Sequence, residues 1–414
     1  MAVSGGLDGT SGIDMQDTEL KGSVKLGSYL KQLRLGYGFS LRKVEERARL
    51  VGGGIDNSQL SRYEKGRCFP SFDKLRVLAD IFNVSVQNFS DIVDLEEYES
   101  LRPVTNDFED LIALGNREAT LGNCSRSYAA FQKAVEVVEA EDDDGEDHAA
   151  RRARARYGLA RGLLRLGKLS LAEAELRNIL RLGTGVDRNI TIKTLLQLTN
   201  AHAERGDRFL ARLEAEKCLA IAREEGDNHS VAYAVHALGR IAYEDTDYSG
   251  SLAYYRDALT LYEDVHDQPN VILMKVLIGS CHVALSRYKV GVKLISEALR
   301  LARREGLRRV CALALCELMQ AEFAQGNNTR AKMYIREVDA LAGAERAEDR
   351  FVDLLFNSAY YLWEIARQEG NLIQEKIAFG RLKYLRSSLE RVTHEAEKFD
   401  AHIGRRKECE DLDL

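Results

Sequence analysis

Ten consecutive residues combine hydroxyl, amide and cationic side chains in one short stretch, Ser58-Gln59-Leu60-Ser61-Arg62-Tyr63-Glu64-Lys65-Gly66-Arg67. An arginine there could read the O6 and N7 atoms of guanine with two hydrogen bonds, and its polar neighbours could reach base edges or phosphates. The charge distribution fits this chemistry. Residues 21–90 hold 13 Lys/Arg and 6 Asp/Glu, a net +7, which leaves −13 for the rest of a chain whose total is −6. A basic segment on an acidic body is expected if only that segment meets phosphates.

Five short helices are predicted to position these side chains. The apolar spacing predicts helices at about 24–35, 41–50, 58–65 and 72–82, and a fifth that runs from 85 into 95. Ser40 is placed to cap the second helix through its hydroxyl alone, and Ser71 to cap the fourth. Either Asp56 or Asn57 caps the third helix, and Gly66 ends it in the left-handed conformation.

This segment resembles the Cro/phage-repressor (XRE) family of helix-turn-helix domains. In that family the third helix lies in the major groove, and the N-termini of helices two and three point at phosphates. The residues that the resemblance places at base edges are Asn57, Ser58, Ser61 and Arg62. Those that it places near the DNA backbone are Ser40, Arg42, Gln59, Lys65 and Arg67.

Arg34 and Glu64 match a pair that joins helices one and three of the family by a salt bridge, and we assign them that structural role rather than DNA contact. Two features depart from the family pattern. Leu41 stands where glutamine is frequent, and the turn at 49–55 is longer than usual, although its three glycines let it bend without disturbing helix three. The alternative interpretation is a degenerate copy used only for dimer contacts, against which the +7 charge argues.

A second pattern recurs from residue 106 onward: a helix, a glycine or polar turn, and another helix. The turn residues are Gly122, Gly167, Gly206, Thr246, Ser286, Gly326 and Gly370, with spacings of 45, 39, 40, 40, 40 and 44. Such a period indicates a solenoid. These units resemble tetratricopeptide (TPR) repeats, with helices longer than usual because the period exceeds the common value of about 34. We therefore predict an all-α chain, with a five-helix helix-turn-helix domain followed by a TPR-like α-solenoid of about seven helical hairpins.

Each unit of such an array buries its apolar stripe against its neighbours, and the first helices line a concave face. Asparagine and arginine on that face could pair with the backbone and carboxylate of an extended peptide, while aromatic rings would take its side chains. The alternative for each aromatic residue is ordinary packing between repeats. The residues predicted to line the face are Asn116, Tyr157, Arg161, Lys193, Asn200, Tyr233, His236, Arg240, Tyr243, Gln320, Phe323, Asn357 and Tyr360.

The remaining composition excludes several classes of protein. No apolar stretch approaches the ~18 residues of a membrane span, the start is not a signal peptide, and the seven cysteines form no CxxC pair. We expect a reduced cytosolic protein without metal or cofactor, and no enzyme, because no nucleophile elbow, P-loop or HExxH motif occurs. The expected domains are a disordered leader at 1–20, the DNA-binding domain at 21–90, a helical linker at 91–105, the repeats at 106–390, and a helix end with a charged tail at 391–414.

A helix-turn-helix head on a TPR array resembles the RRNPP peptide-pheromone receptors, which include transcription factors that control quorum sensing. The resemblance implies a homodimeric, sequence-specific regulator of transcription that binds double-stranded DNA and is gated by a small peptide in the TPR groove. One alternative keeps the DNA-binding role but makes the effector a protein or a small molecule. The other is an interaction scaffold whose head is vestigial.

Overall fold

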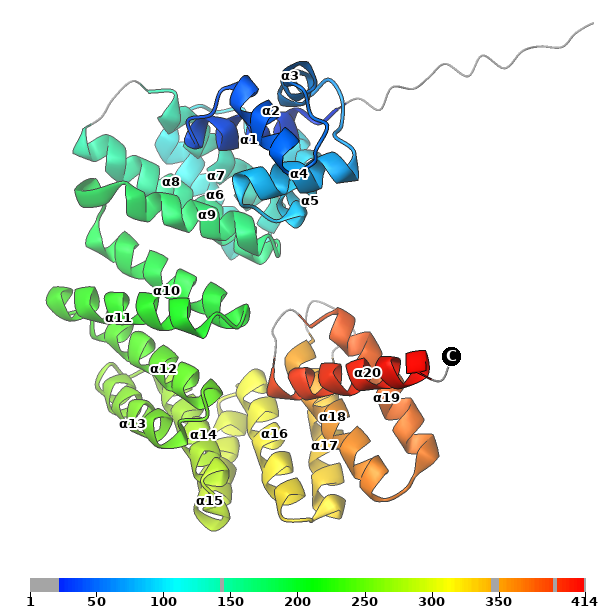
Figure 1. The fold of residues 1–414 in the computed structure, drawn as a ribbon. Coiled ribbons are helices and arrows are strands. Elements are labelled where there is room, and N and C mark those ends of the chain that lie inside the picture. Colours follow the sequence, from blue (N-terminus) through cyan, green and yellow to red (C-terminus); the bar gives the residue numbers. More distant parts are fainter. Residues whose placement is uncertain (1–21, 142–144, 344–349, 390–392, 413–414) are drawn as a thin grey trace, which may run out of the picture. The chain divides into compact units, whose positions relative to one another are not determined.

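The computed structural model describes residues 22–141, 145–343, 350–389 and 393–412. Within these ranges the secondary structure is entirely helical, which confirms the predicted fold class (Figure 1). The leader predicted at 1–20 lies outside the described residues. The chain forms two compact units, one from residues 1–143 and 158–175 and the other from 144–157 and 176–414. The domain boundaries expected from the sequence stay predictions.

The head follows the predicted order of helices closely. Its elements are α1 (Val24–Gly36), α2 (Leu41–Leu50), α3 (Asn57–Glu64), α4 (Phe72–Phe82), α5 (Val86–Asp94) and the 3-10 helix η1 (Leu95–Leu101). Apolar residues spaced at helical intervals meet in one core, which includes Leu30, Leu60, Leu78, Phe82 and Phe89. Burial of these side chains contributes about 1.5–3 kcal/mol each to holding the helices together.

Capping side chains fix where the helices of the head begin. The Ser40 hydroxyl accepts a hydrogen bond from the Lys43 amide at 3.2 Å, as predicted. Asp56, rather than Asn57, caps α3 by accepting from the Gln59 amide at 2.7 Å. Ser71 is the N-cap of α4, as predicted, although its side chain makes no capping hydrogen bond within the described structure. Gly66 ends α3 with a φ of 62°, as predicted.

Seven helical hairpins follow within the described residues. They pair α6 (Phe108–Thr120) with α7 (Cys124–Glu139), α8 (Glu146–Arg165) with α9 (Leu169–Arg181), α10 (Arg188–Glu204) with α11 (Arg208–Glu225), α12 (Asn228–Glu244) with α13 (Tyr248–Asp264), α14 (Gln268–Ala284) with α15 (Tyr288–Arg304), α16 (Arg308–Ala324) with α17 (Asn328–Ala342), and α18 (Val352–Gln368) with α19 (Leu372–Ser387). A short 3-10 helix, η2 (Gly183–Gly185), follows α9, and α20 (His394–Leu412) follows the last hairpin. Helices α8 and α9 each contribute residues to both compact units.

All seven predicted turn residues adopt a positive φ, between 60° and 81°. Five are glycines, for which this conformation carries no side-chain penalty, whereas Thr246 and Ser286 adopt it despite their Cβ atoms. Small residues on the first helices let bulky partners approach, as the sequence pattern predicts. A Cβ atom on Gly239 would lie 2.7 Å from the Tyr255 ring, and one on Gly115 would lie 2.7 Å from the Phe131 ring.

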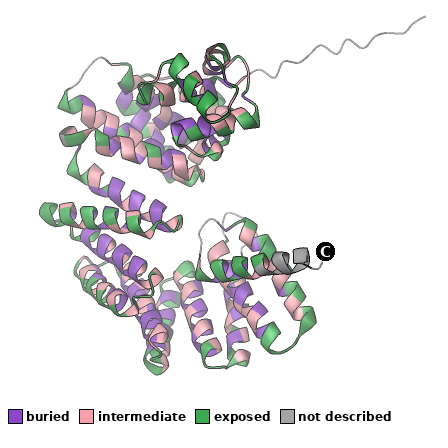
Figure 2. Ribbon diagram, in the orientation of Figure 1, coloured by how far each residue is buried: buried purple, intermediate pink, exposed green. Residues whose placement is uncertain are grey.

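The first helices of the hairpins in the second unit form the inner layer of the stack. Helix α10 contacts α12, α14 contacts α16, and α16 contacts α18, while no comparable contact joins the second helices of neighbouring hairpins in the part of the chain that the structure describes. Closer spacing along one layer curves the stack toward it, which makes the first helices the concave side. Figure 2 shows buried residues between helices and exposed residues along the outer helices. None of the described helices is apolar over a length that could cross a membrane.

Candidate DNA-binding surface and ligand-binding face

The N-termini of α2 and α3 meet around a shallow hollow in the head. Its lining contains three of the four residues predicted at base edges, Asn57, Ser58 and Ser61. It also contains Ser40 and Arg42, which were predicted near the DNA backbone, together with Arg34 and Leu41. Arg62, Lys65 and Arg67 are exposed on or just after α3. Side chains that can donate to phosphate and to base edges therefore share one surface of the head, as a recognition helix requires.

The Asp56 carboxylate caps the start of α3 and accepts two hydrogen bonds there. The Ser58 hydroxyl donates to Asp56 Oδ1 at 2.7 Å, and the Gln59 amide donates to the same atom at 2.7 Å. These bonds, that of Ser58 foremost, lower the pKa of the Asp56 carboxyl. Gln59 is also engaged, because its Oε1 accepts from Lys74 Nζ at 2.9 Å. The Gln59 amide is therefore engaged by the cap of α3 rather than open to a phosphate.

Arg34 and Glu64 form the predicted salt bridge between α1 and α3. Arg34 Nε donates to Glu64 Oε1 at 2.6 Å and Nη2 donates to Oε2 at 2.9 Å, while Nη1 donates to the Phe39 carbonyl at 2.9 Å. The hydrogen bonds to Glu64 raise the pKa of Arg34. The two side chains are only 12% and 8% exposed. A bidentate pair with so little exposure fixes the angle at which α3 leaves the core of the head.

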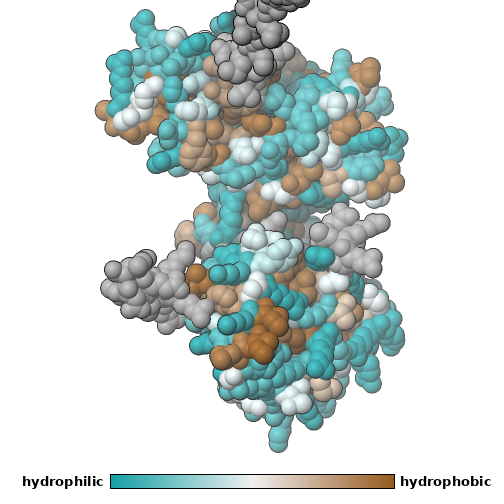
Figure 3. All heavy atoms as spheres, turned by 90° about the vertical axis from the view of Figure 1, so that its right-hand side faces the viewer, coloured by the Kyte–Doolittle hydropathy of each residue, from teal (hydrophilic) through white to brown (hydrophobic). Residues whose placement is uncertain are grey.

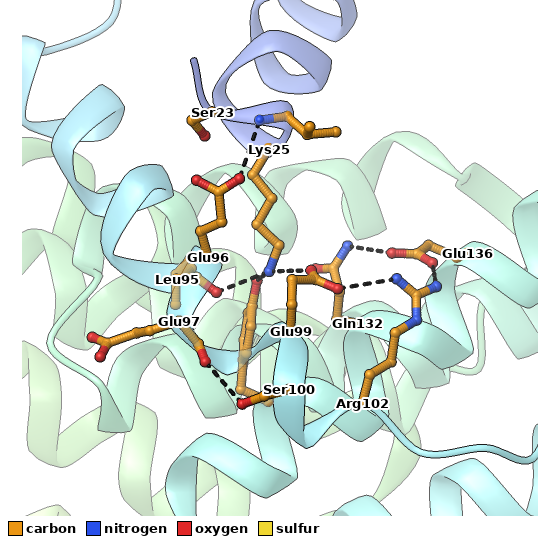
Figure 4. Close-up of polar contacts among 12 residues, drawn as sticks. Ser23, Lys25, Leu95, Glu96, Glu97, Glu99, Ser100, Arg102, Gln132 and Glu136 are labelled. Carbon is orange, nitrogen blue, oxygen red and sulfur yellow. Dashed lines mark hydrogen bonds and ion pairs between the residues drawn. The ribbon is translucent and has the colours of Figure 1, made fainter. Parts of the chain in front are cut away.

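A second polar cluster, around Lys25 and Glu99, joins the head to the first hairpin and was not predicted from the sequence (Figure 4). Lys25 Nζ donates to the Leu95 carbonyl at 2.9 Å and to the Tyr128 hydroxyl at 3.4 Å, and it lies 2.8 Å from Glu99 Oε1. Although burial opposes the shift, the Lys25 ammonium lowers the pKa of the Glu99 carboxyl. Helix α1, η1 and α7 thus converge on one cation.

Two further contacts tie the head to the hairpins of the same compact unit. Arg102 pairs with Glu136 of α7 and lies 3.5 Å from Glu99 Oε2. Lys168, in the turn before α9, lies 3.0 Å from Asp91 Oδ1 and 2.6 Å from Asp94 Oδ2 of α5. These ion pairs therefore hold the head against α7 and the turn before α9 at several points. The partners lie far apart in the sequence, so local patterns could not have revealed these pairs.

The inner face of the second unit brings four of the predicted ligand residues together. Asn200 Nδ2 donates to the Tyr233 hydroxyl at 3.0 Å, and Arg240 Nη2 donates to Asn200 Oδ1 at 3.4 Å. The rings of Tyr233 and His236 have centroids 6.1 Å apart. Burial, with a smaller contribution from Arg240, lowers the pKa of His236 to about 3, so Arg240 is the cation of this cluster at neutral pH.

An acidic cluster lies further along the same face and was missed from the sequence. Burial raises the pKa of Glu317 on α16 to about 7, with Ser280 hydrogen-bonded to it and Glu395 adding to the increase. Glu395 accepts from the Tyr361 hydroxyl at 3.4 Å. The repeat register could have suggested Tyr361, because its place in α18 matches that of Glu317 in α16. Nothing in the sequence placed the start of α20 there.

The other predicted ligand residues occupy varied surroundings. Tyr243 packs on Tyr248 of its own hairpin with centroids 5.1 Å apart, and Phe323 packs on Tyr361 at the same distance. Tyr360 is buried, with its ring 5.8 Å from that of Trp363. The residues that are exposed or half-buried on first helices, without joining the cluster around Arg240, are Asn116, Tyr157, Arg161, Lys193, Gln320 and Asn357.

Asn357 stands out among these because its Oδ1 atom is buried without a hydrogen-bond partner in the described structure. A buried amide oxygen of this kind costs about 1–3 kcal/mol unless water or a ligand donates to it. The described residues contain no group of acidic, histidine and cysteine side chains arranged to hold a metal ion. Six cysteines have described side chains, and all six are free thiols, four of them buried.

Comparisons with known proteins agree with the architecture. Residues 25–89 match a family model described as a helix-turn-helix domain. Aspartyl phosphate phosphatase F from Bacillus subtilis is 11% identical with a TM-score of 0.52, and the match covers 90% of this chain and 94% of that one. The Rap conjugation gene regulator of the plasmid pLS20, solved with the Phr* peptide, is 14% identical with a TM-score of 0.44, covering 90% and 95%. PlcR from Bacillus thuringiensis, solved with the peptide PapR7 and DNA, is 18% identical with a TM-score of 0.34, covering 69% and 99%.

No curated protein matches the chain. At such low identities a structural likeness establishes the fold alone, and among these three only the phosphatase has a TM-score above 0.5. The predicted resemblance of the head is confirmed by the family match, and that of the array by its stacked helical pairs. The chain therefore carries a helix-turn-helix domain at residues 25–89, followed by a TPR-like solenoid.

Proposed function

We propose that this protein is a sequence-specific regulator of transcription whose DNA binding is controlled by a ligand on the inner face of its repeats. One observation carries the DNA-binding part. The exposed cations Arg42, Arg62, Lys65 and Arg67 share the surface around the N-termini of α2 and α3, on a segment with a net charge of +7. That surface has the polarity and shape that a major groove accepts.

The ligand is a short extended peptide in this proposal, as in the RRNPP receptors that the chain resembles. Support comes from the chemistry of the inner face. Arg240, linked through Asn200 to Tyr233, suits a carboxylate, and the unsatisfied Asn357 oxygen suits a backbone N–H. Glu317 and Glu395 suit an ammonium group. A peptide offers all three kinds of group along its length.

The regulator acts as a homodimer in this proposal. Two heads bind half-sites about 34–36 Å apart, one turn of DNA, and the ligand shifts the array between two curvatures with different head separations. The polar cluster around Lys25 and Glu99 supports such coupling, because it ties the head to the first hairpin so that the two move together. A ligand changes DNA affinity only as far as it binds the two curvatures unequally.

The ligand part is tested by calorimetry with synthetic peptides encoded near the gene, using the full chain and an Arg240→Ala variant. We expect one peptide to bind the full chain and to lose at least tenfold in affinity with the variant. Arg300→Ala, which removes an exposed arginine from the outer helix α15, is the matched control and should bind normally. Equal affinity for all three proteins would show that the ligand does not use the Arg240 cluster.

A further inference from the structure

The outer face of α19 exposes large apolar side chains. Leu372, Ile373, Ile377 and Tyr384 are 68%, 76%, 67% and 64% exposed. With Gly380, which is also exposed, three of them follow one stripe of the helix at intervals of four, three and four residues. Figure 3 views the molecule from the side on which α19 lies and shows an apolar patch on the lower part of that face.

The repeat architecture does not require this stripe. The equivalent positions of α15, counted from the first residue of each helix, hold Lys289, Lys293 and Arg300 in place of Ile373, Ile377 and Tyr384. In α11 they hold Phe209 and Leu213, but Glu216 stands where α19 has Gly380. Exposed apolar patches on a folded surface mark interaction sites. Of these three helices, only α19 carries the complete stripe with its glycine, so the repeat as such does not require it.

We propose that α19 is a dimer interface, in which the stripe packs antiparallel on the same stripe of a second copy about a two-fold axis at Gly380. The inference refines the homodimer of the proposed function and rests on it. A dyad requires a self-complementary surface. A Cβ atom on Gly380 would meet nothing within 4 Å, so the bare backbone there lets a second helix cross closely.

The side chains on either side of Gly380 complement one another under that symmetry. Lys376 and Tyr384 stand one helical turn before and one turn after it, so the dyad brings Lys376 of each copy onto Tyr384 of the other. An ammonium over a tyrosine face is attractive. Ile377 and Lys383 are related in the same way, three residues on each side, and the apolar stem of the lysine covers the isoleucine. The lysines of the two copies therefore contact aromatic and aliphatic side chains across the dyad rather than one another.

One helix face is smaller than the roughly 800 Å² per partner that stable complexes bury. The dimer should therefore be weak in free solution. When two heads occupy adjacent half-sites, the DNA holds the copies together, and the effective concentration favours the second contact. Self-association through α19 would then strengthen binding to a paired operator without altering how one head reads one half-site.

Cysteine cross-linking tests the position of the axis. Gly380→Cys places the two sulfurs at the dyad, within the ~4.4–6.8 Å Cα separation that a disulfide needs. Ile373→Cys, seven residues away on the same stripe, is the matched control, because the dyad separates its two copies by roughly 21 Å. On mild oxidation we expect rapid interchain linkage for Gly380→Cys and none above the wild-type background for Ile373→Cys. Linkage of both at equal rates would overturn the arrangement.

Sedimentation of the full chain tests the contact itself. Ile377→Lys should raise the dimer dissociation constant at least tenfold, whereas Lys293→Ala on the outer face of α15 should leave it unchanged. Unaltered self-association of Ile377→Lys would overturn the interface. Binding of each variant to DNA with a single half-site separates this outcome from the proposed function. Retained half-site binding leaves the regulator proposal intact whichever way the dimer behaves, and loss of it in the wild type would count against that proposal instead.

Discussion

Arg62 extends from α3 into solvent, and no hydrogen bond or ion pair restrains its guanidinium within the described structure. It is therefore free to read a base edge. We predict that Arg62→Ala lowers affinity for the specific operator by about 1–3 kcal/mol, the value of one bidentate contact with guanine. Competition gel shifts measure this, with Arg300→Ala of α15 as the control for loss of one exposed charge. If operator affinity is the same in both variants, Arg62 does not read the sequence.

Arg34 has a structural role instead, because its side chain is only 12% exposed and forms an ion pair with Glu64. Arg34→Met leaves a nearly buried carboxylate unpaired, and we expect the head to lose about 2–4 kcal/mol of stability. Hydrogen exchange of amides in α1 and α3 measures this change. Arg49→Met is the control, since its pair with Glu45 is 73% exposed at the arginine and should be worth less than ~1 kcal/mol. Comparable losses in the two variants would contradict the structural role of Arg34.

Protonation of Glu317 on the inner face should make the stability of the fold depend on pH. Its pKa of about 7 in the folded chain is above the usual ~4.3, so the native state holds a proton that the unfolded state has released. The contribution of Glu317 to the free energy of unfolding is then fully present below about pH 4, and it is lost as the pH rises through about 7. Because the carboxyl is half-buried, we expect the loss between pH 5 and 8 to be roughly 1 kcal/mol. Urea unfolding at both pH values should show it, and the same slope in Glu317→Gln would refute it.

Single residues differ in how far the sequence revealed them. Arg34 and Glu64 were found because they belong to a local motif with a known partner. Gln59 was assigned to DNA backbone contact, but its tie to Lys74 depends on how α4 packs against α3, which no motif encodes. Glu317 was missed because a carboxylate in a helix reads as a solvated residue until the burial of that helix face is known.

At the scale of elements, turn chemistry repeats along the array, and three of its turns place a non-glycine residue at positive φ: Thr246, His266 and Ser286. Thr246 has a φ of 63°, where a β-branched side chain is unfavourable. Thr246→Gly should raise the free energy of unfolding by about 0.5–1 kcal/mol. Ser296→Gly, in the middle of α15, should lower it by about the same amount, because glycine weakens a helix interior. Chemical denaturation of both variants decides, and a less stable Thr246→Gly would mean that its side chain stabilises the turn.

The helices themselves were predictable because their signals are local. Apolar spacing, capping residues and the recurrent left-handed turns set where helices begin and end, and the observed bounds of α2 and α4 coincide with those predicted. Ser71 was correctly placed as the N-cap of α4, but the sequence could not show that its hydroxyl makes no capping bond, because that depends on the side-chain rotamer. The contact between Glu395, at the start of α20, and Tyr361 of α18 depends on tertiary packing, which the repeat period does not predict.

At the scale of the whole molecule, the chain forms two compact units that hold different side-chain clusters. The first unit holds the basic head and the polar cluster around Lys25 and Glu99. The second unit holds the inner-face clusters around Arg240 and Glu317. Periodicity could predict that both a head and a concave face exist, because each follows from a repeated local pattern. It could not predict which side chains from different repeats meet, since that depends on the register between helices that are distant in sequence.

The most direct test of the regulator proposal is selection of DNA by the purified full chain, followed by footprinting at several salt concentrations. We predict a protected inverted repeat whose binding constant falls steeply and linearly on a logarithmic salt axis, because lysines and arginines of the head release counterions from phosphates. Binding that stays weak and blind to sequence at every salt concentration would contradict a regulatory role. The inner face of the repeats would then be the functional part of the protein.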